Sequence, residues 1–425
     1  MPLDCIRLPQ LLFPAPGVDL TRFAVIACDQ FTAEPSYWAH AAQLVGDVPS
    51  CLHLTLPEVW LSEDDSPRTR AIHRTMRHYL QDGTLRPLPE GLMLIERDTG
   101  RGAPRRGVLL AFDLEAYDET PGAGTPIRPT EATVTERVPA RLAIRSEAPF
   151  ELPHILLFLD DPAHTVLEPL FAACAQTPPL YDFELMQGGG HITGRLVAPG
   201  AQTVAFADRL SAHAAPDTCL ARYELGADAA PLVFATGDGN HSMAAAKAHW
   251  ERLKPTLSPA ERETHPARWV LAELVNLHDE SICFEAVHRL LLDVAPGDVL
   301  RFLEGWFAAH APQSAAPLSI AWRHQGQNGR LSLPLAPGVL PVSALQDALD
   351  AYLAARPQAG IDFIHGTDTL LHLADAPGRI GFVLPDFPKA QLFPYVMQRG
   401  VLPRKTFSMG TALEKRYYLE ARAIR

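Results

Sequence analysis

The sequence has no apolar run long enough to cross a membrane and no segment typical of a secretory leader. The first ten residues, MPLDCIRLPQ, lack both a positively charged start and the apolar core of a signal peptide. No stretch reaches the roughly 18 consecutive apolar residues that a membrane-spanning helix needs. These absences predict a cytoplasmic protein that does not have a membrane as its partner.

Cysteines that stand in pairs are also missing. The 6 cysteines are separated from one another, and no CxxC motif occurs. Zinc sites and disulfide frameworks use paired cysteines, so the pattern predicts buried, reduced thiols. The 17 histidines form no HxxxH or HxH motif with a nearby carboxylate on an evident helix. A histidine metal centre is therefore not expected.

Excess positive charge is absent as well. The net charge is −12 at pH 7, and the charges are spread along the chain. Binding to duplex nucleic acid requires a basic surface that displaces counterions, so nucleic acid is not expected as the main partner. With 425 residues, of which 47% are hydrophobic, the chain can bury a large core and predicts two or three domains.

Apolar periodicity predicts strands and helices in mixed order, without a repeat of fixed period. Strands are expected at residues 23–28, 52–61, 152–159, 182–186, 191–197, 232–236, 269–277 and 282–292. Helices are expected at residues 34–45, 67–80, 165–175, 201–214 and 241–253. This order favours a mixed-sheet α/β (α+β) fold over a regular doubly wound sheet. We expect an N-terminal α/β segment over residues 1–100, a core over 101–295 and a C-terminal α/β segment over 296–425.

The most informative segment is a turn between a strand and a helix at residues 236–247. The strand enters a tight turn that contains Gly237 and Gly239, and Asn240 is expected to cap the helix that follows. The first backbone amides of a helix have no intrahelical partner and carry the positive end of the helix dipole. Such a turn is a binding site for an anion such as phosphate.

Polar side chains in the same turn add chemistry that a plain turn does not need. His241 can donate a hydrogen bond to a phosphate oxygen, and Asp238 can hold a metal ion or orient the imidazole. Ser242 and Lys247 follow within the helix. The alternative is a capped helix after a glycine turn, with His241 as a surface residue.

A second cluster combines charges of both signs just before an apolar strand. Its members are Arg128, Glu131, Glu136, Arg137, Arg141, Arg145, Glu147, Glu151 and His154. Part of a substrate site is one interpretation, and a surface ion-pair network is the other. Two weaker signals are the carboxylates after expected strands, at Asp29 and at Asp160 with Asp161, where a polar loop or a strand-ending turn is the alternative.

Motifs over nearly the whole chain resemble the bacterial family labelled "domain of unknown function 1015". They occur at residues 27–32 (ACDQFT), 128–133 (RPTEAT), 151–154 (ELPH), 188–193 (GGGHIT), 284–289 (FEAVHR) and 402–410 (LPRKTFSMG). The turn at residues 236–242 resembles the Asp-Gly-His-His-Arg turn of the ParB/sulfiredoxin-like superfamily, which includes the nucleotide-binding domain of ParB and the archaeal free-serine kinase. The resemblance implies a ParB/sulfiredoxin-like core within residues 101–295.

The kinase branch of this resemblance implies a phosphotransferase that uses ATP or ADP and Mg²⁺ on a hydroxylated metabolite, with free L-serine as the leading acceptor. It implies that Asp238 and His241 bind phosphate and metal together with Gly237, Gly239, Asn240 and Ser242. Glu131 matches the glutamate that accepts the hydroxyl proton in that kinase. The substrate or the transferring phosphoryl group would be held by arginines: Arg128, Arg137, Arg141 and Arg145.

The turn departs from the superfamily pattern at its last position. Ser242 stands where the superfamily has an arginine that forks onto phosphate. Lys247, Arg289 and Lys405 are the candidate replacements, with Arg404 beside the last of them. Two other interpretations stay open: a nucleotide-gated regulator that resembles the ParB switch, and a family member that keeps the fold without catalysis.

Overall fold

A computed structural model describes residues 4–62, 64–100, 102–120, 122–133, 137–224, 226, 230–314, 316–403 and 405–425. Within the described residues the chain divides into two compact units. The first unit contains Met1–Ile282, Val396–Val401 and Thr411–Arg425, and the second contains Cys283–Tyr395 and Leu402–Gly410. The three segments expected at residues 1–100, 101–295 and 296–425 are defined by local sequence pattern, whereas the two units are defined by compactness. The division into these three segments stays a prediction.

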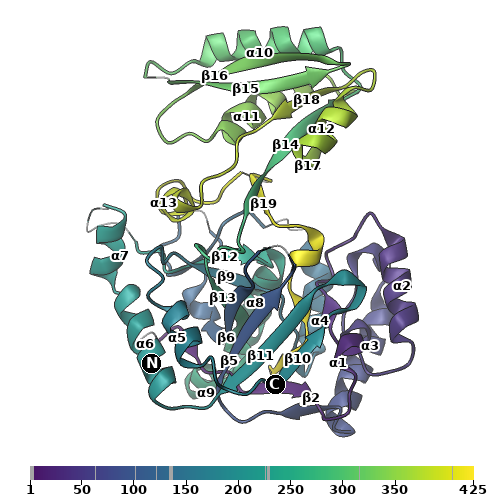
Figure 1. The fold of residues 1–425 in the computed structure, drawn as a ribbon, viewed down its shortest axis with the longest axis vertical. Helices are drawn as coiled ribbons and strands as arrows, with labels where there is room; N and C mark the ends of the chain where they lie inside the picture. Colours follow the sequence, from purple (N-terminus) through teal and green to yellow (C-terminus); the bar gives the residue numbers. More distant parts are fainter. Residues whose placement is uncertain are drawn as a thin grey trace. The chain divides into compact units, whose positions relative to one another are not determined.

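The first unit is built around a large mixed sheet, which Figure 1 shows with α5 and α6 on one side of the unit and α2 and α3 on the other. Its strands are β1 (Ile6–Arg7), β2 (Leu11–Pro14), β3 (Val25–Ile26), β4 (Leu85–Pro87), β5 (Leu92–Asp98), β6 (Arg105–Asp113), β7 (Ile127–Pro129), β8 (Phe150–Glu151), β9 (Leu156–Leu159), β10 (Tyr181–Glu184), β11 (His191–Val197), β12 (Phe234–Asp238), β13 (Trp269–Asn276), β20 (Tyr417–Tyr418) and β21 (Ala421–Ala423). Its helices are α1 (Leu20–Phe23), α2 (Pro35–Val45), α3 (Ser66–Gln81), α4 (Val138–Glu147), α5 (Leu167–Ala173), α6 (Ala201–His213), α7 (Pro216–Arg222), α8 (Asn240–Leu253) and α9 (Pro259–Thr264).

The large sheet has the strand order β10-β11-β5-β6-β13-β9-β12-β7, with β1 beside β6. Its central strands are apolar at almost every position because both of their faces are covered. Leu94 and Leu110 pack in the hydrophobic core that includes residues of α5, α6 and α8. Met93 and Leu109 pack in the other core, with residues of α2 and α3. The expected mixed-sheet α/β fold is confirmed.

Two small sheets join the beginning of the chain to its last segment. One has the order β4-β2-β21-β8, and the other consists of β20 and β3. In the second sheet Tyr417 pairs with Ile26, and Tyr418 pairs with Val25. This pairing brings residues near position 415 beside residues near position 28.

Several local predictions are confirmed, among them the strands expected at residues 191–197 and 269–277, which are observed as β11 and β13. The helices expected at residues 34–45, 67–80 and 241–253 are observed as α2, α3 and α8. The strand expected at residues 52–61 is wrong: the segment contains two short 3-10 helices, Cys51–His53 and Glu58–Trp60. The hydroxyl of Ser50 caps the first of them, and Leu54 and Leu56 point into the core. Apolar residues at every second position are typical of a strand, but here Leu54 and Leu56 belong to an irregular segment that buries both side chains.

The second unit contains an antiparallel sheet with the order β16-β15-β18-β14-β17, and β19 pairs with β14. Its strands are β14 (Phe284–Leu292), β15 (Ala316–His324), β16 (Gln327–Leu335), β17 (Gly360–His365), β18 (Ile380–Val383) and β19 (Phe407–Met409). Its helices are α10 (Pro296–His310), α11 (Pro341–Ala354) and α12 (Thr367–Ala374), and α13 (Leu392–Arg399) includes residues of both units. The strand expected at residues 282–292 is confirmed as β14.

In the part of the chain that the structure describes, no helix has the length and apolar character that crossing a membrane requires. The cysteines are free thiols. The prediction that they are buried is confirmed for all but Cys283, which is exposed.

Candidate functional site

The strand-turn-helix segment is formed by β12, Gly239 and α8. Gly239 has a left-handed backbone with φ 76°, and a Cβ there would lie 2.9 Å from the Cα of Ile155. A Cβ at Gly237 would overlap the ring of Phe158. Both positions therefore require glycine, because the turn is pressed against β9 and the residue before it.

The expectation that Asn240 caps α8 is wrong. Gly239 occupies the cap position, and its carbonyl accepts from the amides of Ser242 at 3.0 Å and Met243 at 2.9 Å. The left-handed backbone of Gly239 starts the helix one residue early, so Asn240 becomes its first residue. Within the described residues, the buried Oδ1 of Asn240 has no hydrogen-bond partner.

Asp238 is held by two contacts at the end of β12. Its Oδ1 accepts from the amide of Gly239 at 2.9 Å, and its Oδ2 lies 3.3 Å from Nζ of Lys415. Lys415 comes from the segment that precedes β20. The role of Asp238 in binding stays a prediction, and the sequence did not indicate the lysine beside it.

Glu131 follows β7, which runs parallel to β12. Thr236 pairs with Pro129, and the hydroxyl of Thr130 donates to the carbonyl of Thr236 at 2.7 Å. Because parallel strands end at the same edge of a sheet, Glu131 leaves β7 at the edge where Asp238 leaves β12. Its proposed role as a base stays a prediction.

A group of ionisable side chains, which we call the polar cluster, lies at the start of α8 and consists of Asp29, Glu58, Arg141, His154, Asp238 and Lys415. Nη2 of Arg141 lies 2.8 Å from Oε1 of Glu58 and 3.6 Å from Oδ2 of Asp29. Nε2 of His154 lies 3.7 Å from the same oxygen of Asp29. The polar cluster thus combines residues from the loop after β3, from the second 3-10 helix, from α4 and from the loop before β9.

Asp29 is an ionised carboxylate at the centre of these contacts. Burial alone would raise its pKa, but the positive charge available at His154 and Arg141 and a hydrogen bond from Gln30 bring the pKa down to about 2. The Nε2 amide of Gln30 donates to Oδ1 at 2.9 Å. The carboxylate therefore stays charged at every physiological pH.

His154 is buried beside Asp29 and Tyr418. Burial lowers the pKa of this imidazole, although the negative charges of Asp29 and Asp238 oppose the shift. The hydroxyl of Tyr418 lies 2.7 Å from Nδ1, and the hydroxyl of Ser242 lies 3.4 Å from Nε2. With Tyr418 as the donor to Nδ1, the ring proton is on Nε2 and faces Asp29 and Ser242. His154 is then a neutral bridge between the carboxylate and the start of α8.

His241 is neutral for a related reason. Burial and the positive charges of Arg141 and Arg137 lower its pKa to about 4, against the smaller opposite effects of Asp29 and Glu58. His241 therefore meets an incoming anion as a neutral hydrogen-bonding group at pH 7. Formal positive charge near the turn comes from Arg137, Arg141 and Lys415 instead.

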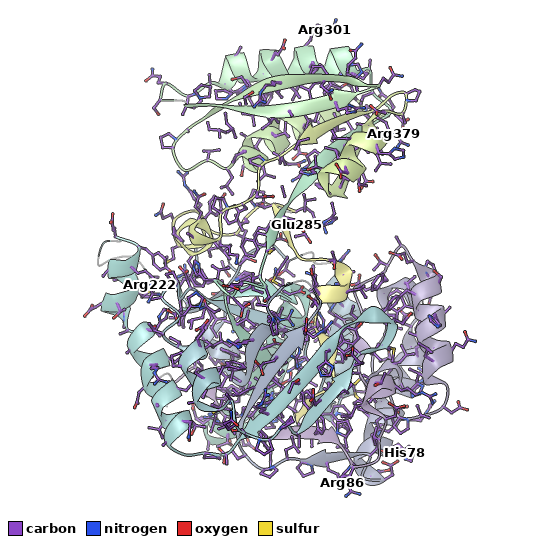
Figure 2. All side chains as sticks on the ribbon, viewed as in Figure 1. His78, Arg86, Arg222, Glu285, Arg301 and Arg379 are labelled. Atoms are coloured by element: carbon purple, nitrogen blue, oxygen red, sulfur yellow. The ribbon has the colours of Figure 1, made fainter. Side chains whose placement is uncertain are left out.

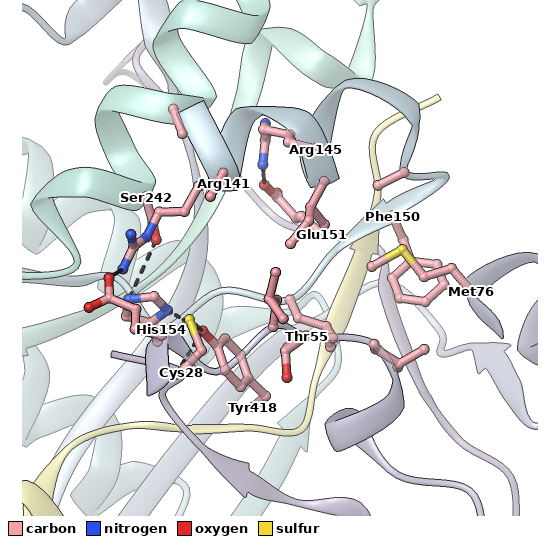
Figure 3. Close-up of a pocket in the computed structure, with 18 of the residues that line it drawn as sticks. Cys28, Thr55, Met76, Arg141, Arg145, Phe150, Glu151, His154, Ser242 and Tyr418 are labelled. Atoms are coloured by element: carbon pink, nitrogen blue, oxygen red, sulfur yellow. Dashed lines mark hydrogen bonds and ion pairs between the residues drawn. The ribbon is translucent and has the colours of Figure 1, made fainter. Parts of the chain in front are cut away.

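A cavity of about 120 Å³ opens beside the polar cluster (Figure 3). Its polar end is lined by Glu58, Arg141, His154 and Ser242. The other end is lined mainly by apolar side chains from the 51–56 segment, α3, α4 and β8. Of the polar cluster, Glu58, Arg141 and His154 line this cavity, whereas Arg86 projects outward at the periphery of the first unit (Figure 2).

The arginines of α4 repeat every four residues and so lie on one face of the helix. Arg137 lies 3.7 Å from Glu58, Arg141 belongs to the polar cluster, and Arg145 lies 2.5 Å from Glu151. Arg128 lies apart from them on β7, where it donates to the carbonyl of Ala230 at 2.8 Å.

The cations expected to replace the missing arginine have other contacts. Nζ of Lys247 donates to the carbonyl of Leu114 at 2.8 Å and lies 2.9 Å from Glu251. Arg289 and Lys405 belong to the second unit, where the guanidinium of Arg289 donates to the carbonyl of Lys405 at 3.2 Å. Lys415 is the lysine that the structure brings to Asp238. Glu136 and Arg404 lie outside the described residues.

Asp160 and Asp161 lie in a strand-ending turn, which is the alternative to a metal site that the sequence also allowed. Oδ2 of Asp161 accepts from the amides of Thr165 and Val166 at 2.6 and 2.8 Å. Oδ1 of Asp160 lies 2.6 Å from Nε2 of His278. Within the described residues, no group of three His, Cys, Asp or Glu side chains is arranged to hold a metal ion.

The fold and the polar cluster define an α/β protein with a charged site where a sheet edge meets the start of a helix. The chain belongs to the family described as "Protein of unknown function (DUF1015)", whose model matches residues 12–358. A search of curated proteins gave no match.

Several solved structures are similar to this chain at low identity. A conserved hypothetical protein from Pyrococcus furiosus is 10% identical, with a TM-score of 0.35, over 73% of this chain and 94% of that one. A free serine kinase in complex with AMP is 9% identical, with a TM-score of 0.37, over 74% and 92%. SbnI from Staphylococcus aureus, truncated at its C-terminus, is 10% identical, with a TM-score of 0.34, over 71% and 82%.

Proposed function

We propose that the protein is a nucleotide-dependent phosphotransferase that phosphorylates a hydroxyl group of a small metabolite. The observation that carries the proposal is the polar cluster, in which ionised Asp29 lies beside Arg141 and His154 at the start of α8. Phosphoryl transfer depends mainly on positioning and on neutralising phosphate charge, and such a cluster provides both. The resemblance of the turn to the Asp-Gly turn of the ParB/sulfiredoxin-like superfamily agrees with it.

In this proposal the start of α8 and its neighbouring cations bind the transferring phosphate. The amides of Asn240 and His241 are at the positive end of the helix dipole, and Arg141 and Lys415 supply charge. The acceptor hydroxyl enters through the cavity. A new P–O bond forms to the hydroxyl oxygen, the P–O bond to the nucleotide breaks, and the hydroxyl proton leaves to a carboxylate.

Two carboxylates are candidates for that proton. Glu131 is the residue that the sequence resemblance favours, and Asp29 is the one in contact with Arg141 and His154. A low pKa does not exclude Asp29, because in phosphoryl transfer the proton moves late.

A nucleotide normally carries Mg²⁺, which neutralises charge on its phosphates. Mg²⁺ in such sites takes one or two carboxylates and completes its shell with phosphate oxygens and water. Asp29 and Asp238 fit this requirement, because both carboxylates belong to the polar cluster and lie near His154. A protein cage of three or more ligands is not needed.

The proposal is tested by incubating the purified protein with Mg²⁺, ATP or ADP, and free L-serine or other hydroxylated acceptors, followed by mass spectrometry of the products. A phosphorylated acceptor that depends on the protein is expected. Nucleotide-dependent stabilisation without product for any donor and acceptor would contradict the proposal and favour the nucleotide-gated regulator.

Two substitutions in the turn test where the nucleotide binds. Asp238→Asn and His241→Ala should abolish the rise in melting temperature that nucleotide causes, because each removes a group at the expected phosphate position. Neither side chain lies in a hydrophobic core, so the melting temperature without nucleotide should change little. Thermal shift measurements with and without nucleotide give both values, and persistence of the rise in both variants would mean that the nucleotide binds elsewhere.

A further inference from the structure

The cavity beside the polar cluster has an apolar end that phosphate binding does not explain. Its wall there consists of Leu54, Leu56, Met76, Ile144, Ala148 and Phe150. An apolar cavity of roughly 150 Å³ in another protein holds a molecule the size of benzene. The cavity here, at about 120 Å³, is somewhat smaller but of the same order, which fits a small branched or aromatic hydrocarbon group.

A guanidinium without a full set of partners lies in the same wall. Nη1 of Arg145 contacts Oε2 of Glu151, but within the described part of the chain neither Nε nor Nη2 of Arg145 has a hydrogen-bond partner, although both atoms are buried. Buried donors are normally paired, and a charged one left unpaired is costly. The two unpaired nitrogen atoms of Arg145 indicate that a hydrogen-bond acceptor is missing from the cavity.

Glu151 does not supply that acceptor because its other oxygen is already used. Oε1 accepts from the amide of Leu271 at 2.9 Å and from Nε of Arg422 at 2.8 Å. Two guanidinium groups thus share one carboxylate, and the group has a net positive charge. An anionic ligand oxygen would complete it.

Free L-serine matches this cavity poorly. Its ammonium and carboxylate are both charged and its side chain has one carbon, so it would leave the apolar wall without a hydrocarbon contact. Burying an ammonium group without a partner against that wall is unfavourable. A ligand with one negative charge and a hydrocarbon group matches both parts of the cavity.

We propose that the cavity binds a hydroxy acid with a branched or aromatic hydrocarbon group. Its carboxylate contacts Arg145, its hydrocarbon group packs against Met76, Ile144 and Phe150, and its hydroxyl points toward Arg141. The identification of this hydroxyl as the phosphoryl acceptor rests on the proposed function. The binding of the hydroxy acid in the cavity is independent of the proposed function.

Calorimetry without nucleotide tests the ligand class directly. The probes are 2-hydroxy-4-methylpentanoate, the matching alcohol 4-methylpentan-2-ol, which lacks the carboxylate, and L-serine. The hydroxy acid should bind at least tenfold more tightly than either of the others. Equal or tighter binding of L-serine, or no binding of the hydroxy acid, would overturn the proposal.

Arg145→Gln tests the carboxylate contact and leaves Glu151 paired with Arg422. This variant should lose at least tenfold in affinity for the hydroxy acid while its weaker affinity for the alcohol stays the same. Circular dichroism and the melting temperature establish that the variant is folded. If a folded variant keeps the parent's preference for the acid over the alcohol, Arg145 is not the carboxylate contact and the proposal is wrong.

A matched pair of substitutions on α4 tests the position of the ligand. Ala140 lines this cavity, whereas Ala143 is exposed on another part of α4. Ala140→Leu should weaken binding of the hydroxy acid at least tenfold by filling space, and Ala143→Leu should leave it unchanged. Equal effects of the two substitutions would contradict binding in this cavity.

The two proposals fail separately. Binding of the hydroxy acid without phosphorylation by any donor would contradict the phosphotransferase and support the cavity ligand. Phosphorylation of L-serine with no measurable binding of the hydroxy acid would support the phosphotransferase and overturn the cavity ligand.

Discussion

Asp29 is a largely buried carboxylate of the polar cluster, and its pKa is lowered by its neighbours. Its folded pKa of about 2 lies below the ordinary value of 3.8, so folding stabilises the ionised form. The resulting contribution to stability is present above pH 4 and is lost as the pH falls toward 2, when the folded state also binds the proton.

Asp29→Asn should therefore reduce the free energy of unfolding at pH 7 and have a much smaller effect near pH 2.5. The physical reason is the loss of a negative charge that Arg141 and the hydrogen bond from Gln30 stabilise. Urea unfolding at pH 7, 4 and 2.5 measures the difference between parent and variant. A difference that does not change with pH would show that the carboxylate is not stabilised by these charges.

Several residues of the polar cluster could not be identified from the sequence. Lys415 and Tyr418 follow one another closely in an ordinary polar-aromatic stretch, and nothing local marks either as part of a site. They reach Asp29 and His154 because β20 pairs with β3 across nearly the whole chain. Asp29 follows an expected strand, but a polar loop is the simpler explanation of a carboxylate at that position.

At the level of elements, the sequence predicted the turn between β12 and α8 because its signals are local. The glycines, the carboxylate and the apolar strand before them lie within a few residues of one another. The expectation for residues 52–61 was wrong because a spacing of two arises in an irregular buried segment as well as in a strand. Residue type favours Asn240 as the cap, whereas the left-handed backbone of Gly239 decides where α8 begins.

Gly239→Ala should destabilise the protein by about 1–3 kcal/mol, because alanine strains a left-handed backbone and its Cβ would press on Ile155. It should also weaken nucleotide binding, since the first amides of α8 would move. Chemical unfolding and calorimetry measure the two effects.

Gly305→Ala is the matched control. Gly305 lies within α10, and a Cβ there meets no atom within 4 Å. Alanine in a helix interior is more favourable than glycine, so stability should rise by about 0.5–1 kcal/mol. A loss of stability at Gly239 no larger than the change at Gly305 would contradict the role given to the left-handed turn.

On the scale of the whole molecule, every member of the polar cluster belongs to the first unit. Ligand binding stabilises the part of a protein to which the ligand binds. Nucleotide, or the hydroxy acid, should therefore slow amide hydrogen exchange in β12, α4 and α8.

Peptides from α10, α11 and α12 in the second unit should exchange at an unchanged rate. Hydrogen exchange followed by mass spectrometry resolves the two units by peptide. Equal protection in both would show that the second unit takes part in binding, as the interpretation of Arg289 and Lys405 as phosphate-binding residues requires.

The segment that contains Lys415 and Tyr418 has a consequence for biosynthesis. Asp29 leaves the ribosome early, but its neighbours from β20 and the preceding loop are translated almost four hundred codons later. A nascent chain that stalls before this point holds Asp29 and His154 without Tyr418, and β3 without its pairing strand. The polar cluster can form completely only after Lys415 has been translated, so translation products that end before this residue cannot complete it.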